Sequence, residues 1–330
     1  MAEPRSILVI QLRRIGDVIL TTPAAAALKK RFPNAAIDFL VEPPGAEALQ
    51  GNPHLREIVV YDASGVVSTL AWLKKIRARR YDWVIDFLGN PRSAMLTASS
   101  GAAVKAGPAH VAHRWAYNTP LTQSLTTHYA GLEKIRVLET LGVPGAGADF
   151  VPRIYIAKRA APRNVIGLVP ASRKDTRRWP ASHYALLGRL LRERLDCELR
   201  VFWGPGERAL AEGIARSIGE GASATPETKT LAEAARLMAD CRLIVTNCNG
   251  PKHLAVALGV PTVTVHGASD PASWNPPHPR HVVVRRGELP CIGCASNSCP
   301  TKIECLNELP AERVLEAALK LLESPAGALT

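Results

Sequence analysis

The sequence has few aromatic residues and no long apolar run, and both shortages narrow what the chain can be. Phe, Trp and Tyr make up 5% of the 330 residues, so aliphatic side chains and alanine must build the core. No stretch reaches the roughly 18 uncharged apolar residues that a membrane-spanning helix needs. The first apolar run, Ile7–Ile10, is too short for the apolar part of a signal peptide. We therefore expect a soluble, cytoplasmic protein.

Acidic residues are outnumbered by basic ones, 29 against 41, which gives a formal net charge of +12. A basic surface attracts anions, and nucleic acid, an anionic membrane and a phosphorylated substrate all qualify. The aromatic residues interleaved with basic ones that suit nucleic acid are missing, so we expect no nucleic-acid partner. Peripheral contact with the inner face of the cytoplasmic membrane is compatible with the charge. The basic segment Leu73–Arg80 could face an anionic substrate, the membrane or water.

The order of apolar segments predicts an α/β fold. Ser6–Gln11 is typical of a buried strand, and Ala36–Val41 is the next strand. Between them, Thr22 and Pro23 have the pattern of an N-cap and a first helical residue. A strand, a helix and a second strand in this order begin a parallel sheet. The second half starts again in the same way at Asn164–Val169.

A proline-rich segment separates the two halves. Residues 143–163 hold three prolines and are predicted to link two domains. We expect residues 1–155 and residues 156–330 to form two Rossmann-like, doubly wound domains facing a cleft. Ligands of such sheets bind at the carboxyl ends of the strands, which makes the loops there the candidate sites.

The loop after the first strand carries Arg13, Arg14, Gly16 and Asp17. It lacks the GxGxxG pattern of dinucleotide-binding proteins. Asp17 could cap the following helix or act as a general base at the end of the strand. Spacing alone favours the cap, because short polar residues are common there.

Three loops of the second half suit a diphosphate. The segment 170–180 has four basic residues within six positions after a strand, and arginine forks bind phosphate well. In the segment 246–253, Asn249 can cap a helix that opens with Gly250 and Pro251, and free N–H groups at a helix start attract phosphate. His253 in its first turn is equally compatible with a ligand contact or a structural role. The segment 266–271 follows the next strand.

Four of the seven cysteines are close together near the end of the chain. Thiolates at these spacings suit a structural zinc or iron–sulfur centre, and reduced thiols or disulfides are the alternatives. The four are Cys291, Cys294, Cys299 and Cys305.

Six segments, spread in order over nearly the whole chain, carry a resemblance to a known family. They are Leu12–Pro23 (LRRIGDVILTTP), Tyr81–Ser93 (YDWVIDFLGNPRS), Arg177–Pro180 (RRWP), the run from Thr246 (TNCNGPKHLA), Leu258–Pro261 (LGVP) and Gly267–Pro271 (GASDP). Together they resemble glycosyltransferase family 9, the lipopolysaccharide heptosyltransferases. The resemblance implies a GT-B fold and inverting transfer of a heptose from ADP-heptose to an acidic lipopolysaccharide-core acceptor. It also implies that the last helix, about 310–322, packs back on the N-terminal domain.

The resemblance also implies roles for single residues. Asp17 matches the family's proposed general base, which reverses the cap-first reading. The resemblance assigns acceptor binding to the domain of residues 1–155 and donor binding to that of residues 156–330. The acceptor is expected at Arg13, Arg14, Asn90 and Arg92. The donor is expected at Ser172, Arg177, Arg178, Asn249, Gly250, Pro251, His253, Gly267 and Asp270. No metal is required for the chemistry, and a role for Mg²⁺ stays open.

One departure from the family matters. The donor loop commonly reads Asn-Asp-Ser-Gly-Pro, and here Cys248 stands in place of the acid. This leaves two alternatives open: a family member with another nucleotide sugar or acceptor, and a nucleotide-sugar or glycan binding protein without turnover.

Overall fold

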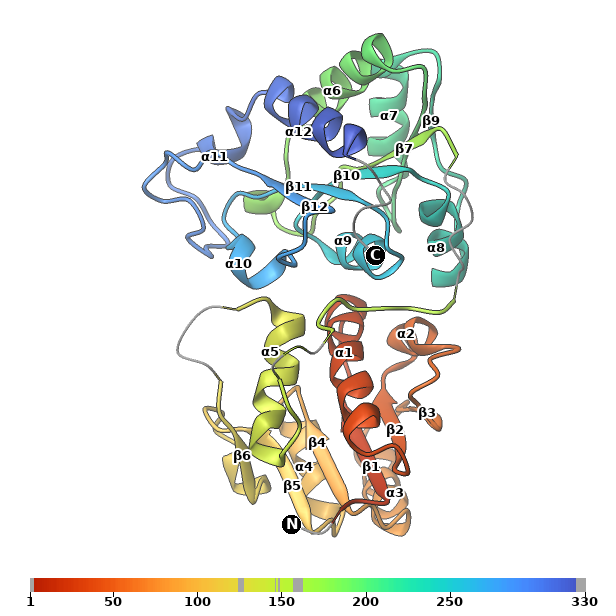
Figure 1. Ribbon diagram of the computed structural model, residues 1–330, viewed down its shortest axis with the longest axis vertical. Coiled ribbons are helices and arrows are strands. Elements are labelled where there is room, and N and C mark those ends of the chain that lie inside the picture. The colour runs from red at the N-terminus through yellow and green to blue at the C-terminus, as the bar shows by residue number, and fades with distance from the viewer. Residues whose placement is uncertain (1–2, 124–127, 146, 148, 157–162, 325–330) are drawn as a thin grey trace. The chain divides into compact units, whose positions relative to one another are not determined.

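The chain forms two compact units, Met1–Ile156 and Ala157–Thr330. The computed structural model describes residues 3–123, 128–145, 147, 149–156 and 163–324 (Figure 1). Each unit has one six-stranded sheet whose neighbouring strands all run parallel. Among the described helices none is both long and apolar enough to cross a membrane.

The first sheet has the strand order β3-β2-β1-β4-β5-β6. Its strands are β1 Ser6–Ile10, β2 Ala36–Val41, β3 Glu57–Val60, β4 Trp83–Asp86, β5 Val104–Pro108 and β6 Thr119–Leu121. The helices of this unit are α1 Ile15–Arg31, α2 Pro43–Ala46, α3 Val66–Ala78, α4 Pro91–Ser99 and α5 Ala130–Arg136, with 3-10 turns η1 Glu47–Leu49, η2 Arg114–Ala116 and η3 Val137–Leu141. Figure 1 shows α1 and α5 side by side over the strands, and α3 packs with α4.

The second sheet has the order β12-β11-β10-β7-β8-β9. Its strands are β7 Val165–Val169, β8 Glu198–Val201, β9 Ala222–Ala224, β10 Leu243–Asn247, β11 Thr262–Val265 and β12 His281–Val284. The helices are α6 Ala181–Arg194, α7 Arg208–Ile218, α8 Leu231–Ala239, α9 Gly250–Ala257, α10 Pro271–Trp274, α11 Glu304–Asn307 and α12 Ala311–Glu323, with the 3-10 turn η4 Asp175–Arg177.

The central strands are almost continuously apolar because helices cover both faces of each sheet. All residues of β4, β7 and β10 are buried. Strand order reverses between β1 and β4 in the first unit and between β7 and β10 in the second. At such a switch point the loops after neighbouring strands diverge and leave room for a ligand. The fold therefore directs attention to the loops after these four strands.

Helix α1 begins earlier than the sequence predicted. It starts at Ile15 and encloses Pro23, which was expected at its first position after an N-cap at Thr22. Proline has no N–H for the carbonyl four residues earlier, which normally breaks a helix. Here the hydroxyl of Thr22 donates to that carbonyl, Ile19 O, at 2.8 Å. The side chain of Thr22 thus replaces the missing backbone bond, and the helix continues.

The closing helix α12 packs on the sheet of the second unit, and the return to the first domain that the resemblance implies stays a prediction. It lies against α6 and strands β10 to β12. Val314, Leu315 and Ala318 on its inner face belong to the same buried cluster as the strands. The apolar stripe of an amphipathic helix is what drives its packing, and the second sheet takes up this stripe.

Candidate active site

Asp17 lies in the first turn of α1, directly beyond the carboxyl end of β1. The turn into the helix requires a left-handed backbone at Arg14, with φ of 61°. No side chain caps the start of α1 by a hydrogen bond, so Asp17 does not act as its cap. Burial raises the pKa of the half-buried Asp17, whereas the positive charges of Lys134 and Arg14 oppose that rise. A carboxylate with this pKa shift and no capping duty suits a general base.

Lys134, on α5, lies near Asp17 and was missed by sequence reasoning. Its ammonium donates to Phe87 O at 3.1 Å and to Gln11 Oε1 at 3.3 Å. Burial lowers the pKa of Lys134 to about 8, and the carboxylates of Asp17 and Asp86 act in the opposite direction. A single lysine in a polar helical segment carries no sequence signal for this placement.

Asp86, the last residue of β4, organises the neighbouring loop. It is fully buried and accepts the N–H groups of Leu88 at 2.8 Å and Gly89 at 3.1 Å. The hydroxyl of Tyr117 also donates to it, at 2.7 Å. Burial raises the pKa of Asp86. Since these donors occupy its oxygens, Asp86 shapes the site and does not serve as its base.

Two of the predicted acceptor residues meet at one carboxylate. Arg13 and Arg92 both pair with Glu42, at 3.5 Å and 2.9 Å. The guanidinium of Arg92 also lies over the ring of Tyr61, 5.6 Å from its centre. The structure therefore brings Arg13 and Arg92 together, near the carboxyl end of β1, as a partly exposed basic pair.

The other two predicted acceptor residues behave differently from each other. Asn90 caps α4: its Oδ1 accepts the N–H of Ser93 at 2.8 Å, while the hydroxyl of Ser93 accepts the N–H of Asn90. Its side-chain oxygen is thus occupied by helix capping. Arg14 is exposed at the start of α1.

In the second unit, two asparagines fasten the loop after β10 to the loop after β7. Asn247 Oδ1 accepts the N–H of Trp179 at 3.0 Å, and its Nδ2 donates to Pro170 O at 2.7 Å. Asn249 Nδ2 donates to Ala171 O at 2.8 Å, and its Oδ1 caps α9 as predicted. The two donor-side loops are therefore one hydrogen-bonded unit.

Basic groups with unused polar atoms gather around these loops. Three buried nitrogens, Arg177 Nε, His253 Nδ1 and His266 Nε2, have no hydrogen-bond partner within the part of the chain that the structure describes. Burial and the nearby charges of Lys252, Arg285 and Arg177 together lower the pKa of His266 to about 3, although its hydrogen bond with Ser269 O acts in the opposite direction. Burial likewise lowers the pKa of His253, helped by Lys252.

Neutral imidazoles among cations, with unused nitrogens, suit an anionic ligand. Buried polar groups normally form hydrogen bonds, so these unbonded nitrogens indicate that a bound ligand supplies the missing partner. The predicted residues Arg177 and His253 are part of this group. His266 and Lys252 were not predicted as site residues, although both lie in the loops that were.

Other predicted donor residues hold the loops in place. Arg178 donates to Ser172 O at 2.6 Å and pairs with Asp175 at 3.1 Å. Asp270 accepts the N–H of Ala272 at 3.0 Å and so caps α10. These bonds give Arg178 and Asp270 structural duties.

The glycines of the donor loops are needed for different reasons. A Cβ at Gly267 would come within 2.8 Å of the side chain of Leu306, so the close approach requires glycine. Gly250 has open space around it and begins α9, with Pro251 next in the chain. The start of α9 is thus free of side-chain bulk at Gly250, as a backbone contact to a ligand requires.

The cysteine-rich loop adjoins these donor-side loops. Gly293 N donates to Gly267 O at 3.2 Å, Ala295 N to Ala268 O at 2.6 Å, and Thr176 Oγ1 to Ser296 O at 2.9 Å. Its four cysteines are free thiols, and no group of three or more His, Cys, Asp or Glu side chains in the described residues could hold a metal ion. Burial raises the pKa of Cys305, and the other three thiols raise it further, so the four share one neighbourhood. The structural-metal hypothesis stays a prediction.

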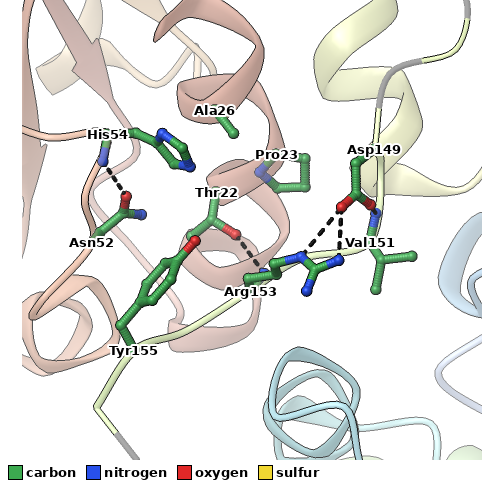
Figure 2. A pocket seen from close by; sticks show the side chains of 9 residues that line it. All are labelled: Thr22, Pro23, Ala26, Asn52, His54, Asp149, Val151, Arg153 and Tyr155. Carbon is green, nitrogen blue, oxygen red and sulfur yellow. Dashed lines mark hydrogen bonds and ion pairs between the residues drawn. The ribbon is translucent and has the colours of Figure 1, made fainter. Parts of the chain in front are cut away.

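A pocket of about 190 Å³ lies on another part of α1 and was not predicted (Figure 2). The segment from Asp149 to Tyr155 closes it, held by the ion pair of Asp149 and Arg153 at 2.9 Å and by a bond from Arg153 N to Thr22 Oγ1 at 3.2 Å. The residues that line it are Thr22, Pro23, Ala26, Asn52, His54, Asp149, Val151, Arg153 and Tyr155.

Comparison with known proteins gives the class. The fold matches the family 9 glycosyl transferase of Veillonella parvula with a TM-score of 0.84 and 25% identity, covering 96% of this chain and 97% of that one. It also matches the E. coli heptosyltransferase WaaC with ADP-2-deoxy-2-fluoro heptose, with a TM-score of 0.75 and 22% identity over 96% and 99% of the two chains. The protein is thus a glycosyltransferase of the GT-B fold.

The sequence comparisons give the family. Lipopolysaccharide heptosyltransferase 1 of Pseudomonas aeruginosa is 26% identical over 324 residues, which cover 89% of this chain and 87% of that protein. The model of glycosyltransferase family 9 (heptosyltransferase) matches residues 69–303. The chain belongs to this family, and the resemblance seen in the sequence is confirmed.

Proposed function

We propose that this enzyme transfers a heptose from ADP-heptose to an acidic sugar of the lipopolysaccharide inner core, with Asp17 as the general base. The observation that carries the proposal is the position of Asp17, half-buried beyond the end of β1 with no capping bond. The similar WaaC structure holds ADP-2-deoxy-2-fluoro heptose, which supports ADP-heptose as the donor. Family membership supports the reaction type.

The proposed chemistry is a single displacement. The Asp17 carboxylate takes the proton of an acceptor hydroxyl while its oxygen bonds to the anomeric carbon. The bond from that carbon to the diphosphate breaks, ADP leaves with the electron pair, and the configuration inverts. The transition state has oxocarbenium character, as in glycoside hydrolysis.

The departing diphosphate gains negative charge, and hydrogen-bond donors of the second unit can stabilise that charge. Arg177, His253 and the first N–H groups of α9 are arranged around one hydrogen-bonded pair of loops. Fixed donors aimed at a developing charge are an effective form of catalysis, so we expect no metal to be required. The neutral His253 would donate a hydrogen bond without adding charge.

The acceptor is anchored in a membrane, and helix α3 suits contact with an anionic bilayer. Val66, Val67 and Leu70 near its start are 76%, 82% and 53% exposed. Lys74 and Arg77 follow on the same helix, which carries no acidic residue. Apolar side chains inserted at the headgroups and basic ones beside anionic lipids form the usual interfacial helix.

Vesicle binding tests this contact. Val66→Ser with Val67→Ser should lose binding to phosphatidylglycerol vesicles, whereas Val60→Ser, at an exposed valine of β3, should not. Equal binding of all three proteins would remove α3 as the contact.

Transfer from ADP-heptose to a lipid A–Kdo acceptor tests the enzyme proposal. Asp17→Asn should lower kcat by about 10²- to 10⁴-fold, the usual contribution of a positioned base, and should still bind ADP. Glu139→Gln is the control, because it removes an exposed carboxylate of the same unit. An active Asp17→Asn enzyme would contradict the assignment of the base.

Cys248 supports the two alternatives. Cys248 is buried at the position where the family commonly has an acid. Its thiol acts to raise the pKa of Lys252 in the donor-side loops, against the larger effect of burial. A protein that transfers a different sugar would use another nucleotide sugar in the same assay. A protein that binds ADP in calorimetry and never transfers with any donor would be a binding protein.

A further inference from the structure

Lys134 is held at the place where the carboxyl ends of the two central strands of the first unit meet. Gln11 follows β1 directly, and Phe87 follows β4 directly. The Lys134 ammonium bonds to Gln11 Oε1 at 3.3 Å and to Phe87 O at 3.1 Å, and it lies 4.9 Å from the centre of the Phe87 ring. Helix α5 packs against α1, and the charge of Lys134 acts on the Asp17 carboxyl in the first turn of α1.

We propose that Lys134 is a positioning residue for Asp17: its ammonium, fixed by Gln11 and Phe87, is the counter-charge that keeps the Asp17 carboxylate ionised in a partly dehydrated site. The proposal rests on the proposed function, in which Asp17 is the base. Lys134 is not a catalytic residue in this scheme, because it acts on the carboxylate and not on the sugar.

Besides each other, Asp17 and Lys134 are affected by two charged groups, Arg14 and Asp86. Arg14, on the same helix, and Lys134, on α5, favour the charged form of Asp17, and Lys134 has the larger effect. Arg14 is exposed, so solvent and salt screen it more strongly than the half-buried Lys134. Asp17 and Asp86 in turn favour the charged form of Lys134.

Asp86 is not the carboxylate that the charge of Lys134 serves. Its oxygens already accept the N–H groups of Leu88 and Gly89 and the hydroxyl of Tyr117. Within the described residues, the hydrogen bonds of the Lys134 ammonium go to the neutral oxygens of Gln11 and Phe87, and no carboxylate forms an ion pair with it. Asp17 is the neighbouring carboxylate whose ionisation the reaction uses.

The arrangement balances two requirements of a general base. Burial raises the pKa of a carboxyl, which makes it a stronger base but lowers the fraction that is ionised and able to accept a proton. A fixed positive charge lowers the pKa again and so raises the ionised fraction. Without Lys134, burial of Asp17 would act unopposed except by the exposed Arg14.

The test compares Lys134→Gln, which removes the charge and keeps hydrogen bonding, with Lys134→Arg, which keeps the charge. Lys30→Gln is the control, because Lys30 is an exposed lysine at the far end of the same helix as Asp17. The pH dependence of kcat/KM for transfer is measured for all four proteins. A neighbouring opposite charge lowers a carboxyl pKa by about one unit or more, so the acid limb of Lys134→Gln should move up by about one pH unit.

The expected pattern is specific to a charge effect. Lys134→Gln should be about tenfold slower than wild type on the acid limb and close to wild type above it. Lys134→Arg and Lys30→Gln should keep the wild-type midpoint. A uniform loss at every pH, or a Lys134→Arg midpoint equal to that of Lys134→Gln, would show that Lys134 matters for packing alone and would overturn the proposal.

A second readout separates this proposal from the proposed function. In protein labelled with ¹³C at the aspartate carboxyls, the Asp17 signal is assigned by its loss in Asp17→Asn. Its midpoint should rise by about one unit in Lys134→Gln, whether or not any sugar is transferred. Absence of transfer by the wild type would defeat the proposed function, whereas an unmoved Asp17 midpoint would defeat the role of Lys134.

Discussion

Replacing Lys252 with methionine tests whether the second unit holds an ammonium in its interior. Lys252 is 0% exposed, and its Nζ donates to the backbone oxygen of Trp274. Burial lowers its pKa to about 8, although the Cys248 thiol acts in the opposite direction. The folded protein therefore binds this proton more weakly than the unfolded chain does. This difference lowers the free energy of unfolding at neutral pH.

The magnitude follows from the shift. The pKa falls from 10.5 to about 8, and each unit is worth about 1.4 kcal/mol, so the charged amine costs about 3 kcal/mol at pH 7. Methionine removes this cost and loses one hydrogen bond worth about 1 kcal/mol, which leaves a net gain of about 2 kcal/mol. The folded pKa is the lower one, so wild-type stability rises with pH above about 8. Between pH 7 and pH 9.5 the advantage of methionine should shrink by about 2 kcal/mol.

Urea unfolding of paired samples at the two pH values measures this difference. Fluorine-labelled tryptophan lets the second unit be followed separately, through Trp179, Trp203 and Trp274, because a protein of two units need not unfold in one step. Lys229→Met, at an exposed lysine of the same unit, should show no such trend. A stability difference for Lys252→Met that is the same at both pH values would refute a buried, charged amine.

Four further experiments test other parts of the structure and the proposed chemistry. Asp38 is fully buried and accepts Arg56 Nε at 2.9 Å and the Tyr81 hydroxyl at 2.7 Å, so Asp38→Asn should destabilise the first unit by about 3–5 kcal/mol in urea unfolding. Gly107→Ala would push a Cβ into the ring of Tyr117, at a cost of about 1–3 kcal/mol that should largely disappear in a Tyr117→Ala background. Elemental analysis of purified protein should find about one zinc or one iron–sulfur centre per chain if the cysteine loop binds metal, and metal-free protein with unchanged stability would end that hypothesis. Transfer should continue in EDTA, and its loss on chelation with recovery on adding Mg²⁺ would contradict a metal-free displacement.

The sequence predicted the doubly wound fold and the loops at the strand ends, because both follow from local patterns. Apolar runs followed by short polar loops mark the strands, and Asp17 and Asn249 were found through their places after β1 and β10. The start of α1 was misjudged, because Pro23 looks like a helix start unless a hydroxyl is known to replace its missing bond.

Residues whose role depends on distant partners could not be predicted. Lys134 meets Gln11 across 123 positions of the chain, and no local pattern marks such a pair. The resemblance implies ligand contacts for Asn90 and Asp270; in the structure their side chains cap helices, and the ligand contacts stay predictions. A polar residue before a helix satisfies the helix first, and family motifs contain such residues for structural reasons as well.

The hydroxyl of Thr22 has a mechanical consequence. It closes the gap that Pro23 leaves in α1, and it also accepts the N–H of Arg153, in the segment by which the chain leaves the first unit. Ile154 in that segment is buried as well. A pull on the chain from the second unit would thus act on the side of α1, the helix that carries Asp17. The Thr22 hydroxyl would transmit this pull, because it bonds both to α1 and to Arg153.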